Sequence, residues 1–111
     1  MLNLTHTPMT RVDLLIAEGT INSETAPQFE QALEERLDKG TSNLVLDLEQ
    51  VDYMSSAGLR AMVAAYKRAK SQGGTLVLAA PSDRVREVLD LGGLIEVFPI
   101  YQDRLTAVGS F

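Results

Sequence analysis

Two adjacent serines, Ser55 and Ser56, are the residues of this chain whose type and position favour chemistry at a surface. They stand in the segment Asp52-Tyr53-Met54-Ser55-Ser56-Ala57-Gly58-Leu59-Arg60, where a buried strand is expected to end and a helix to begin. A serine at a helix start caps it when its hydroxyl oxygen accepts a hydrogen bond from an orphan N–H group. The same position also tolerates a phosphate, because free N–H groups and a partial positive charge gather there. Capping and phosphorylation are therefore both open as interpretations. One serine could cap the helix while its neighbour is phosphorylated.

The sequence does not supply the other residues that an enzyme would need. A serine hydrolase requires a base beside its nucleophile, but the single histidine, His6, lies in an expected first strand. Neither serine lies in a GxSxG elbow, and the phosphate-binding patterns GxxxxGK[ST] and GxGxxG are absent. There is no cysteine to act as nucleophile or metal ligand. We therefore expect no catalysis, no cofactor and no metal site.

A phospho-aspartate receiver is a further interpretation, because Asp47 lies near the end of an expected buried strand. Such a site needs several acidic residues, since a hard divalent cation takes several oxygen ligands. The first long strand ends Ala17-Glu18-Gly19 and offers one acid, and no lysine ends a later strand. We expect Asp47 to be a strand-end or turn carboxylate.

Composition indicates a small protein that binds neither nucleic acid nor membrane directly. Fifteen acidic and ten basic residues give a formal net charge of −5, whereas phosphate neutralisation needs clustered Lys and Arg. The cluster Lys67-Arg68-Ala69-Lys70 is more simply the solvated face of a helix end. No apolar run approaches the roughly 18 residues of a membrane span, and residues 1–6 lack the pattern of a signal peptide. We expect a cytoplasmic protein, and a monomer or weak dimer.

Apolar periodicity predicts strands and helices that alternate along the chain. Residues with strand character fall in five segments: 2–7, 11–18, 44–48, 75–80 and 97–100. Helical spacing falls in four segments: Thr25 to Gly40, Ser56 to Gly73-Gly74, Pro81-Ser82 to Gly92-Gly93, and residues 102–109. Parallel neighbours need a crossover, which a helix supplies. The pattern therefore predicts one α/β domain with a mixed, mostly parallel sheet of about five strands, about four helices and an N-terminal antiparallel hairpin.

Local signals refine this arrangement. Gly19 is expected to break the second strand, with Pro8 and Thr10 in the preceding turn. The spacing Thr25-Ala26-Pro27-Gln28 fits a capping box at the first helix. Residues at helical spacing are expected to face the core, namely Ala26, Phe29, Leu33, Leu37, Leu59, Met62, Val63, Tyr66, Val85, Val88, Leu89 and Leu91, while Glu30, Glu34 and Glu35 face water.

The serine segment resembles the signature of STAS-domain proteins, the bacterial anti-sigma factor antagonists. Tyr53-Met54-Ser55-Ser56-Ala57-Gly58-Leu59 is similar to the phosphoacceptor motif of that family. Three further segments resemble family patterns in the same order: Glu18-Gly19-Thr20-Ile21-Asn22, Leu44-Val45-Leu46-Asp47-Leu48, and Leu89-Asp90-Leu91-Gly92-Gly93-Leu94. The resemblance spans almost the whole chain and implies a STAS domain over residues 1–111.

The resemblance also implies a function by partner switching in the regulation of transcription. The unmodified protein would bind an anti-sigma factor that is also a serine kinase and so release a sigma factor. The kinase would phosphorylate Ser56, with Ser55 as second choice, and a PP2C-type phosphatase would reverse the modification. Ser55 and Asn22 depart from the family pattern, because many members carry Asp at both positions. Both departures remove a carboxylate from the neighbourhood of Ser56.

The partner surface is expected at the start of the second helix and the adjacent turn. Its candidate residues are small or polar: Asn22, Ser23, Ser55, Ser56, Ala57, Gly58 and Arg60. For Ala57 and Gly58, tight strand-to-helix packing is the alternative role, while Met54 and Leu59 are expected in the core. A constitutive STAS interaction subunit, for example of a lipid-transport ATPase complex, is the alternative function. In that case the Ser56 region would be contact surface only.

Overall fold

The structure, a computed structural model, describes residues 1–9, 11–39 and 42–111. Within them the strands are β1 (Leu2–Pro8), β2 (Asp13–Ile21), β3 (Asn43–Met54), β4 (Thr75–Ala79) and β5 (Ile100–Tyr101). The helices are α1 (Ala26–Asp38), α2 (Ser56–Ser71), α3 (Asp83–Leu91) and α4 (Arg104–Gly109). Strands and helices therefore alternate as the apolar periodicity predicts.

The sheet has the strand order β1-β2-β3-β4-β5. β1 and β2 form an antiparallel hairpin, with Leu2 paired to Gly19. The remaining neighbours are parallel, and the pairing of β2 with β3 extends to Ile21 opposite Met54. This confirms the predicted α/β fold and places the ends of β2 and β3 side by side.

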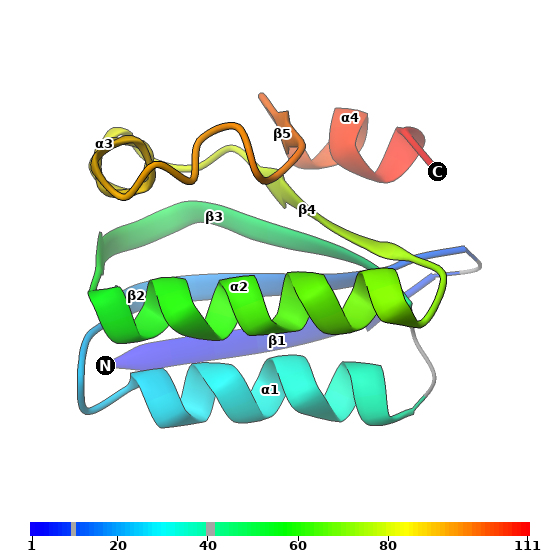
Figure 1. Cartoon of the computed structure of the whole chain (residues 1–111), viewed down its shortest axis with the longest axis horizontal. Helices are drawn as coiled ribbons and strands as arrows, with labels where there is room; N and C mark the ends of the chain where they lie inside the picture. Colours follow the sequence, from blue (N-terminus) through cyan, green and yellow to red (C-terminus); the bar gives the residue numbers. More distant parts are fainter. Residues whose placement is uncertain (10, 40–41) are drawn as a thin grey trace.

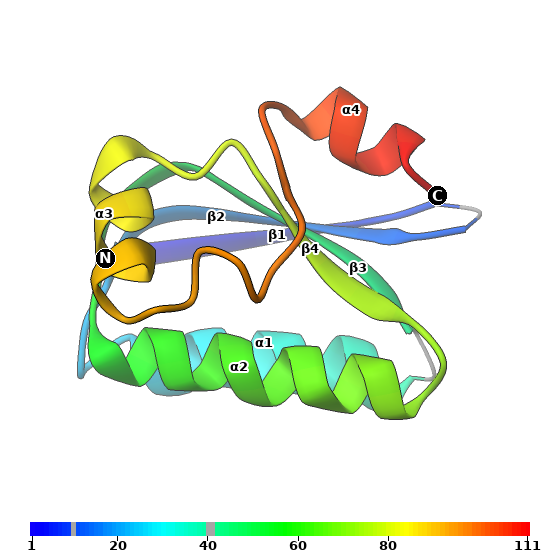
Figure 2. The ribbon, with the colours of Figure 1, turned by 45° about the horizontal axis from the view of Figure 1, so that its top comes forward.

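The helices cover the two faces of the sheet unequally. α1 and α2 lie side by side against one face (Figure 1), whereas α4 lies on the opposite face (Figure 2). The main core lies on the α1–α2 side and also receives Val85 and Leu89 of α3. A smaller apolar cluster, which includes Val45 and Ala107, lies beneath α4. Among the described residues, no helix has both the length and the apolar character to cross a bilayer.

The predicted helix faces are confirmed except in α3, where Val88 is only half-buried and lies outside the core clusters. Phe29, Leu33 and Leu37 of α1 are almost fully buried, while the glutamates of that helix are exposed. Leu91 was expected to face the core, but it is 81% exposed because α3 ends there, past its apolar face. The double-glycine helix ends are confirmed, since α2 ends at Ser71 and α3 at Leu91. The expected stop at Gly40 and the turn residue Thr10 lie outside the described residues.

Gly19 does not end its strand. β2 continues through it to Ile21, with Gly19 at a φ of +116° and an irregular register beside it. A Cβ at Gly19 would lie 2.1 Å from the backbone oxygen of Met1, which accepts a hydrogen bond from Thr20 N at 3.1 Å. Gly19 therefore marks an irregularity within β2, and the strand stays in the sheet on both sides of it.

Other strand bounds and one capping prediction also differ from the sequence pattern. Pro8 ends β1 instead of lying in the turn, and the edge strand is Ile100–Tyr101 instead of residues 97–100. The capping box at α1 is wrong: Thr25 occupies the N-cap position, but its side chain caps nothing. Gln28 does not reach back to Thr25, because its amide donates to the backbone oxygen of Leu2 at 3.0 Å.

Candidate functional site

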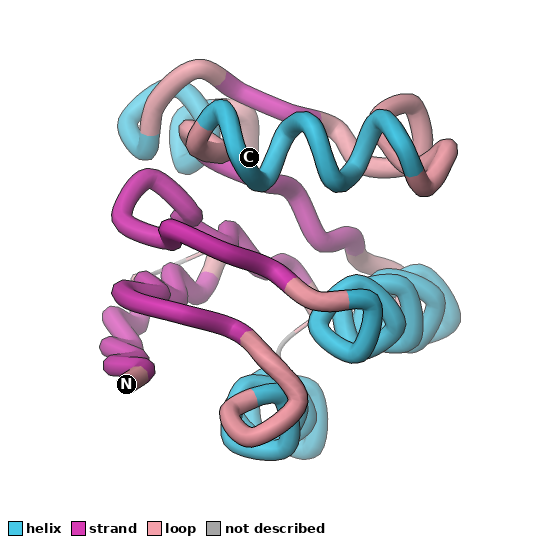
Figure 3. The backbone as a smooth tube through the Cα atoms, turned by 90° about the vertical axis from the view of Figure 1, so that its left-hand side faces the viewer, coloured by secondary structure: helices cyan, strands magenta, loops and turns pink. Residues whose placement is uncertain are grey.

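The candidate site lies where β2 and β3 end and α1 and α2 begin. Figure 3 faces this edge of the molecule, and both helices are seen there nearly end-on beside the strands. The backbone N–H of Ser55 donates to the carbonyl oxygen of Ile21 at 2.8 Å. This bond continues the pairing of β2 and β3 by one residue, and so fixes the serine segment beside the turn that enters α1.

Ser55 is the N-cap of α2. Its backbone is extended, with φ −83° and ψ 170°, and its Oγ accepts a hydrogen bond from Gly58 N at 3.3 Å. Its carbonyl oxygen accepts the first helical bond, from Leu59 N at 3.0 Å. The residue is half-buried. The capping interpretation is therefore confirmed for Ser55.

Ser56 has a different environment, although it is the next residue. It is the first residue of α2 and is exposed, and its hydroxyl makes no hydrogen bond within the described chain. Burial of this side chain would have ruled out a modified or partner-facing serine, and the side chain is not buried. The first N–H groups of a helix lack intrahelical acceptors, so a phosphate on Ser56 would meet a favourable backbone field.

The next two residues have different roles: Gly58 allows close packing, and Ala57 contributes to the surface. Gly58 is buried, and a Cβ there would lie 2.7 Å from Ile21 Cγ2 and 3.0 Å from Met54 Cγ. Its small size is therefore needed for α2 to approach the sheet. Ala57 is half-buried and lines a shallow groove of about 240 Å³ between the starts of α1 and α2. As expected, Met54 and Leu59 contact the core.

The turn before α1 brings Asn22 and Ser23 to the same edge. Asn22 Oδ1 accepts hydrogen bonds from Glu24 N at 2.9 Å and Thr25 N at 3.0 Å. The Thr25 hydroxyl accepts from Asn22 N at 2.8 Å and donates to the carbonyl oxygen of Thr20 at 2.7 Å. The Asn22 and Thr25 side chains therefore organise this turn together, whereas Gln28 of the predicted capping box takes no part in it. Ser23 is exposed and lines the groove with Ala57.

Arg60 lies on the same groove, one helical turn after Ser56. It is exposed and makes no hydrogen bond or ion pair within the described residues. Glu30 of α1 lines the groove opposite it. The groove thus combines an unpaired guanidinium with one carboxylate, and the unpaired hydroxyl of Ser56 lies one helical turn before Arg60.

Three residues at the ends of the strands extend this edge and were missed as site residues: the exposed Asp52 and Tyr53 and the half-buried Thr20. Tyr53 is 42% exposed although it lies on β3. Thr20 Oγ1 donates to Asp52 Oδ1 at 2.8 Å across β2 and β3. The signal was present in the sequence, because β3 changes after Leu48 from mostly apolar residues to mostly polar ones.

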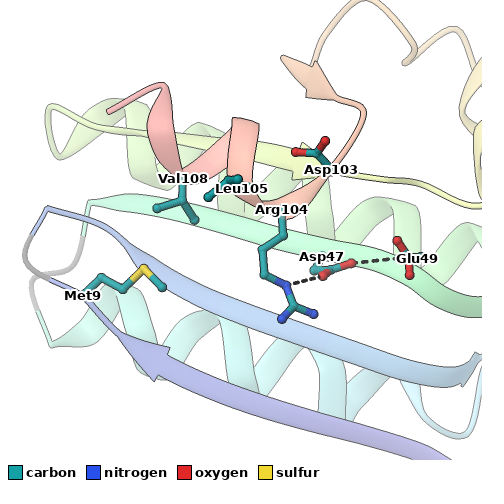
Figure 4. A pocket seen from close by; sticks show the side chains of 7 residues that line it. All are labelled: Met9, Asp47, Glu49, Asp103, Arg104, Leu105 and Val108. Atoms are coloured by element: carbon teal, nitrogen blue, oxygen red, sulfur yellow. Dashed lines mark hydrogen bonds and ion pairs between the residues drawn. The ribbon is translucent and has the colours of Figure 1, made fainter.

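Asp47 lies away from this edge, on the opposite face of the sheet. It is 4% exposed and stands inside β3, so the expectation of a strand-end or turn carboxylate is wrong. Its carboxylate accepts hydrogen bonds from Arg104 Nε at 2.8 Å and Glu49 N at 3.0 Å (Figure 4). Asp47 therefore ties β3 to α4 beside a pocket that Met9 and Val108 also line.

The fold and this edge define a small α/β domain with an exposed polar edge, and comparison with known proteins gives its family. Residues 9–107 match the STAS domain, so the chain belongs to the STAS-domain family. It is 40% identical over 106 residues to a Bordetella bronchiseptica protein named as an anti-sigma factor antagonist, BtrV, with 93% of this chain and 91% of that one covered. It is 36% identical over 89 residues to the anti-sigma-B factor antagonist of Listeria monocytogenes, covering 80% and 77%.

A solved structure agrees with the sequence relatives. The crystal structure of an anti-sigma factor antagonist from Mycobacterium paratuberculosis matches with a TM-score of 0.90 at 26% identity, covering 99% of this chain and 93% of that one. The family resemblance drawn from the serine segment is therefore confirmed. Its relatives are regulatory proteins, and the chain is a regulatory STAS-domain protein and not an enzyme.

Proposed function

We propose that this chain is an anti-sigma factor antagonist whose binding surface is switched off by phosphorylation of Ser56. The observation that carries the proposal is that the two serines have different hydrogen bonding and exposure. The Ser55 hydroxyl caps α2 by accepting from Gly58 N, whereas the Ser56 hydroxyl is unpaired and exposed to solvent. The names of the relatives supply the class of partner, an anti-sigma factor.

The proposed partner surface is the edge around Ser56. Ser23, Ser56 and Arg60 are exposed and would contact the partner directly, with Ala57 between them. Asn22, Ser55 and Gly58 would shape this surface through the turn, the cap and the close packing of α2. Because the side chains of Ser23, Ser56 and Ala57 are short, a partner could approach the backbone closely there.

Phosphorylation would act by charge and desolvation at this surface. A phosphate adds about −1.5 to −2 charge and three acceptor oxygens. Placed in an interface, it would cost several kcal/mol through like-charge repulsion and incomplete desolvation. A loss of ~3 kcal/mol weakens binding more than about a hundredfold. No large rearrangement of the fold is needed, because Ser56 is already exposed.

The partner would be a serine-kinase type anti-sigma factor, which phosphorylates Ser56 with ATP, and a PP2C-type phosphatase would restore the hydroxyl. Both act on a regulator of transcription, so we place the protein in the cytoplasm. The test is the intact mass of the protein after incubation with the cognate kinase and ATP. The proposal predicts addition of one phosphate, which Ser56→Ala abolishes.

Ser55→Asn is the matched control. Asparagine caps helices as well as serine does but offers no hydroxyl to a kinase. We expect this variant to accept one phosphate, as the unaltered protein does. A phosphate that persists in Ser56→Ala and disappears in Ser55→Asn would assign the modification to Ser55 and contradict the proposal. Absence of any phosphate, with partner binding intact in Ser56→Ala, would favour a constitutive interaction subunit.

A further inference from the structure

Arg60 lies one helical turn after the proposed phosphoacceptor, Ser56. It follows Ser56 by four residues within α2, and both side chains are exposed. Residues four apart lie on the same face of an α-helix, about 5–6 Å between their Cβ atoms. Helical side chains also lean toward the N-terminus. The guanidinium of Arg60 is therefore within reach of a group attached to the Ser56 oxygen.

The charges around Ser56 leave Arg60 available. It makes no ion pair within the described residues, although Glu30 of α1 lines the same groove. Of the other carboxylates at this edge, Asp52 accepts a hydrogen bond from Thr20, and Glu24, in the turn before α1, is exposed and makes no ion pair within the described residues. The groups closest to Ser56 in the chain and across the turn, Ser55 and Asn22, are uncharged. A new anion on Ser56 would thus find one unpaired cation on its own helix face.

We infer that Arg60 binds the phosphate of phosphorylated Ser56 and holds it against α2. The inference rests on the proposed function, because it concerns the modified form of the same site. Arg60 is a positioning residue here, and its planar guanidinium suits two phosphate oxygens at once. Phosphorylation would then change two charges on the partner surface. It adds the phosphate, and it withdraws from any acidic partner a cation that the unmodified protein presents.

The inference can be tested without a kinase or a partner. Phosphoserine is incorporated at position 56 during translation, and the second pKa of the phosphate is followed by ³¹P NMR during a pH titration. A nearby cation favours the dianion and so lowers this pKa. Arg60→Ala should therefore raise it, by about 0.15 to 0.4 unit for a surface pair one helical turn apart. Arg60→Lys keeps the positive charge but loses the planar guanidinium that can bind two phosphate oxygens, so it should raise the phosphate pKa less.

Lys67→Ala is the matched control on the same helix. Lys67 is exposed and lies eleven residues beyond Ser56, roughly 16 Å along the helix axis. That distance exceeds the screening length of about 8 Å at physiological salt. Removing this charge should leave the phosphate pKa unchanged. Glu30→Gln should lower the pKa slightly, because it removes the carboxylate that competes for Arg60.

Two results would overturn the inference. One is a pKa in Arg60→Ala that stays within about 0.1 unit of the unaltered phosphoprotein. The other is a change in Lys67→Ala as large as that in Arg60→Ala, which would show only a general effect of net charge. The inference and the proposed function fail separately, because phosphoserine is installed here without the kinase. A shift in Arg60→Ala supports the inference even if the kinase assay finds no phosphate on Ser56.

Discussion

Replacement of Ser55 by alanine tests whether the two serines have separate roles. The change removes the oxygen that accepts from Gly58 N at 3.3 Å and leaves the start of α2 without a side-chain cap. Loss of an N-cap costs about 0.5–2 kcal/mol. The hydrogen bond is long and the residue only half-buried, so we expect about 0.5–1 kcal/mol here. Ser56→Ala removes an exposed hydroxyl with no partner, so its effect should stay within about 0.5 kcal/mol.

Urea unfolding of four proteins measures this difference. With a slope of about 1.5 kcal/mol per molar for a domain of this size, Ser55→Ala should lower the midpoint by roughly 0.3–0.7 M. Ser55→Asn should keep the midpoint of the unaltered protein, because asparagine also caps. Ser56→Ala should keep it as well. If Ser56→Ala lost as much stability as Ser55→Ala, the assignment of the cap to Ser55 would be refuted.

Three further changes test the packing and charges that support the site. Gly58→Ala should destabilise the protein by about 1–3 kcal/mol in the same urea assay, because its Cβ would lie 2.7 Å from Ile21 Cγ2; a gain in stability would contradict this packing. Arg104→Ala should cost about 1–3 kcal/mol, since it takes the ion-pair partner from the buried Asp47, and the cost should shrink when Asp47→Asn is added. Hydrogen bonds from the side chain and then the amide of Thr106 lower the pKa of Asp103 below its ordinary value of 3.8. The contribution of Asp103 to stability is therefore present above that value and lost as pH falls through the lowered pKa; Asp103→Asn should abolish this acid limb in amide exchange of α4.

The sequence predicted the layers of the fold because apolar spacing is a local signal. The buried face of α1 and the nearly continuous apolar run Leu44–Leu48, interrupted by Asp47, both follow from such spacing. The errors arose where distant partners override local signals. Gly19 resembles a strand end, yet it pairs with β1 and β3, and the pairing with β3 carries β2 on to Ile21. β3 continues to Met54 for the same reason, although its later residues are mostly polar and exposed.

The candidate site was predictable in its location but not in its roles. The serine segment and the small residues after it indicated a helix start, and the structure places one there. Which serine caps the helix depends on where the helix begins. That position is fixed by the hydrogen bond from Ser55 N to Ile21 O, which joins two residues far apart in the sequence. Likewise, nothing near Asp47 in the sequence points to Arg104 as its partner. Contacts between distant residues therefore decide the details that spacing leaves open.

The most direct test of partner switching compares two forms of the protein that differ only at Ser56. The affinity of the unmodified protein and of protein carrying phosphoserine at position 56 is measured by calorimetry against the cognate anti-sigma factor. The proposed function predicts tight binding of the unmodified form and a dissociation constant more than about a hundredfold larger for the phosphorylated form. Equal affinities of the two forms would contradict it.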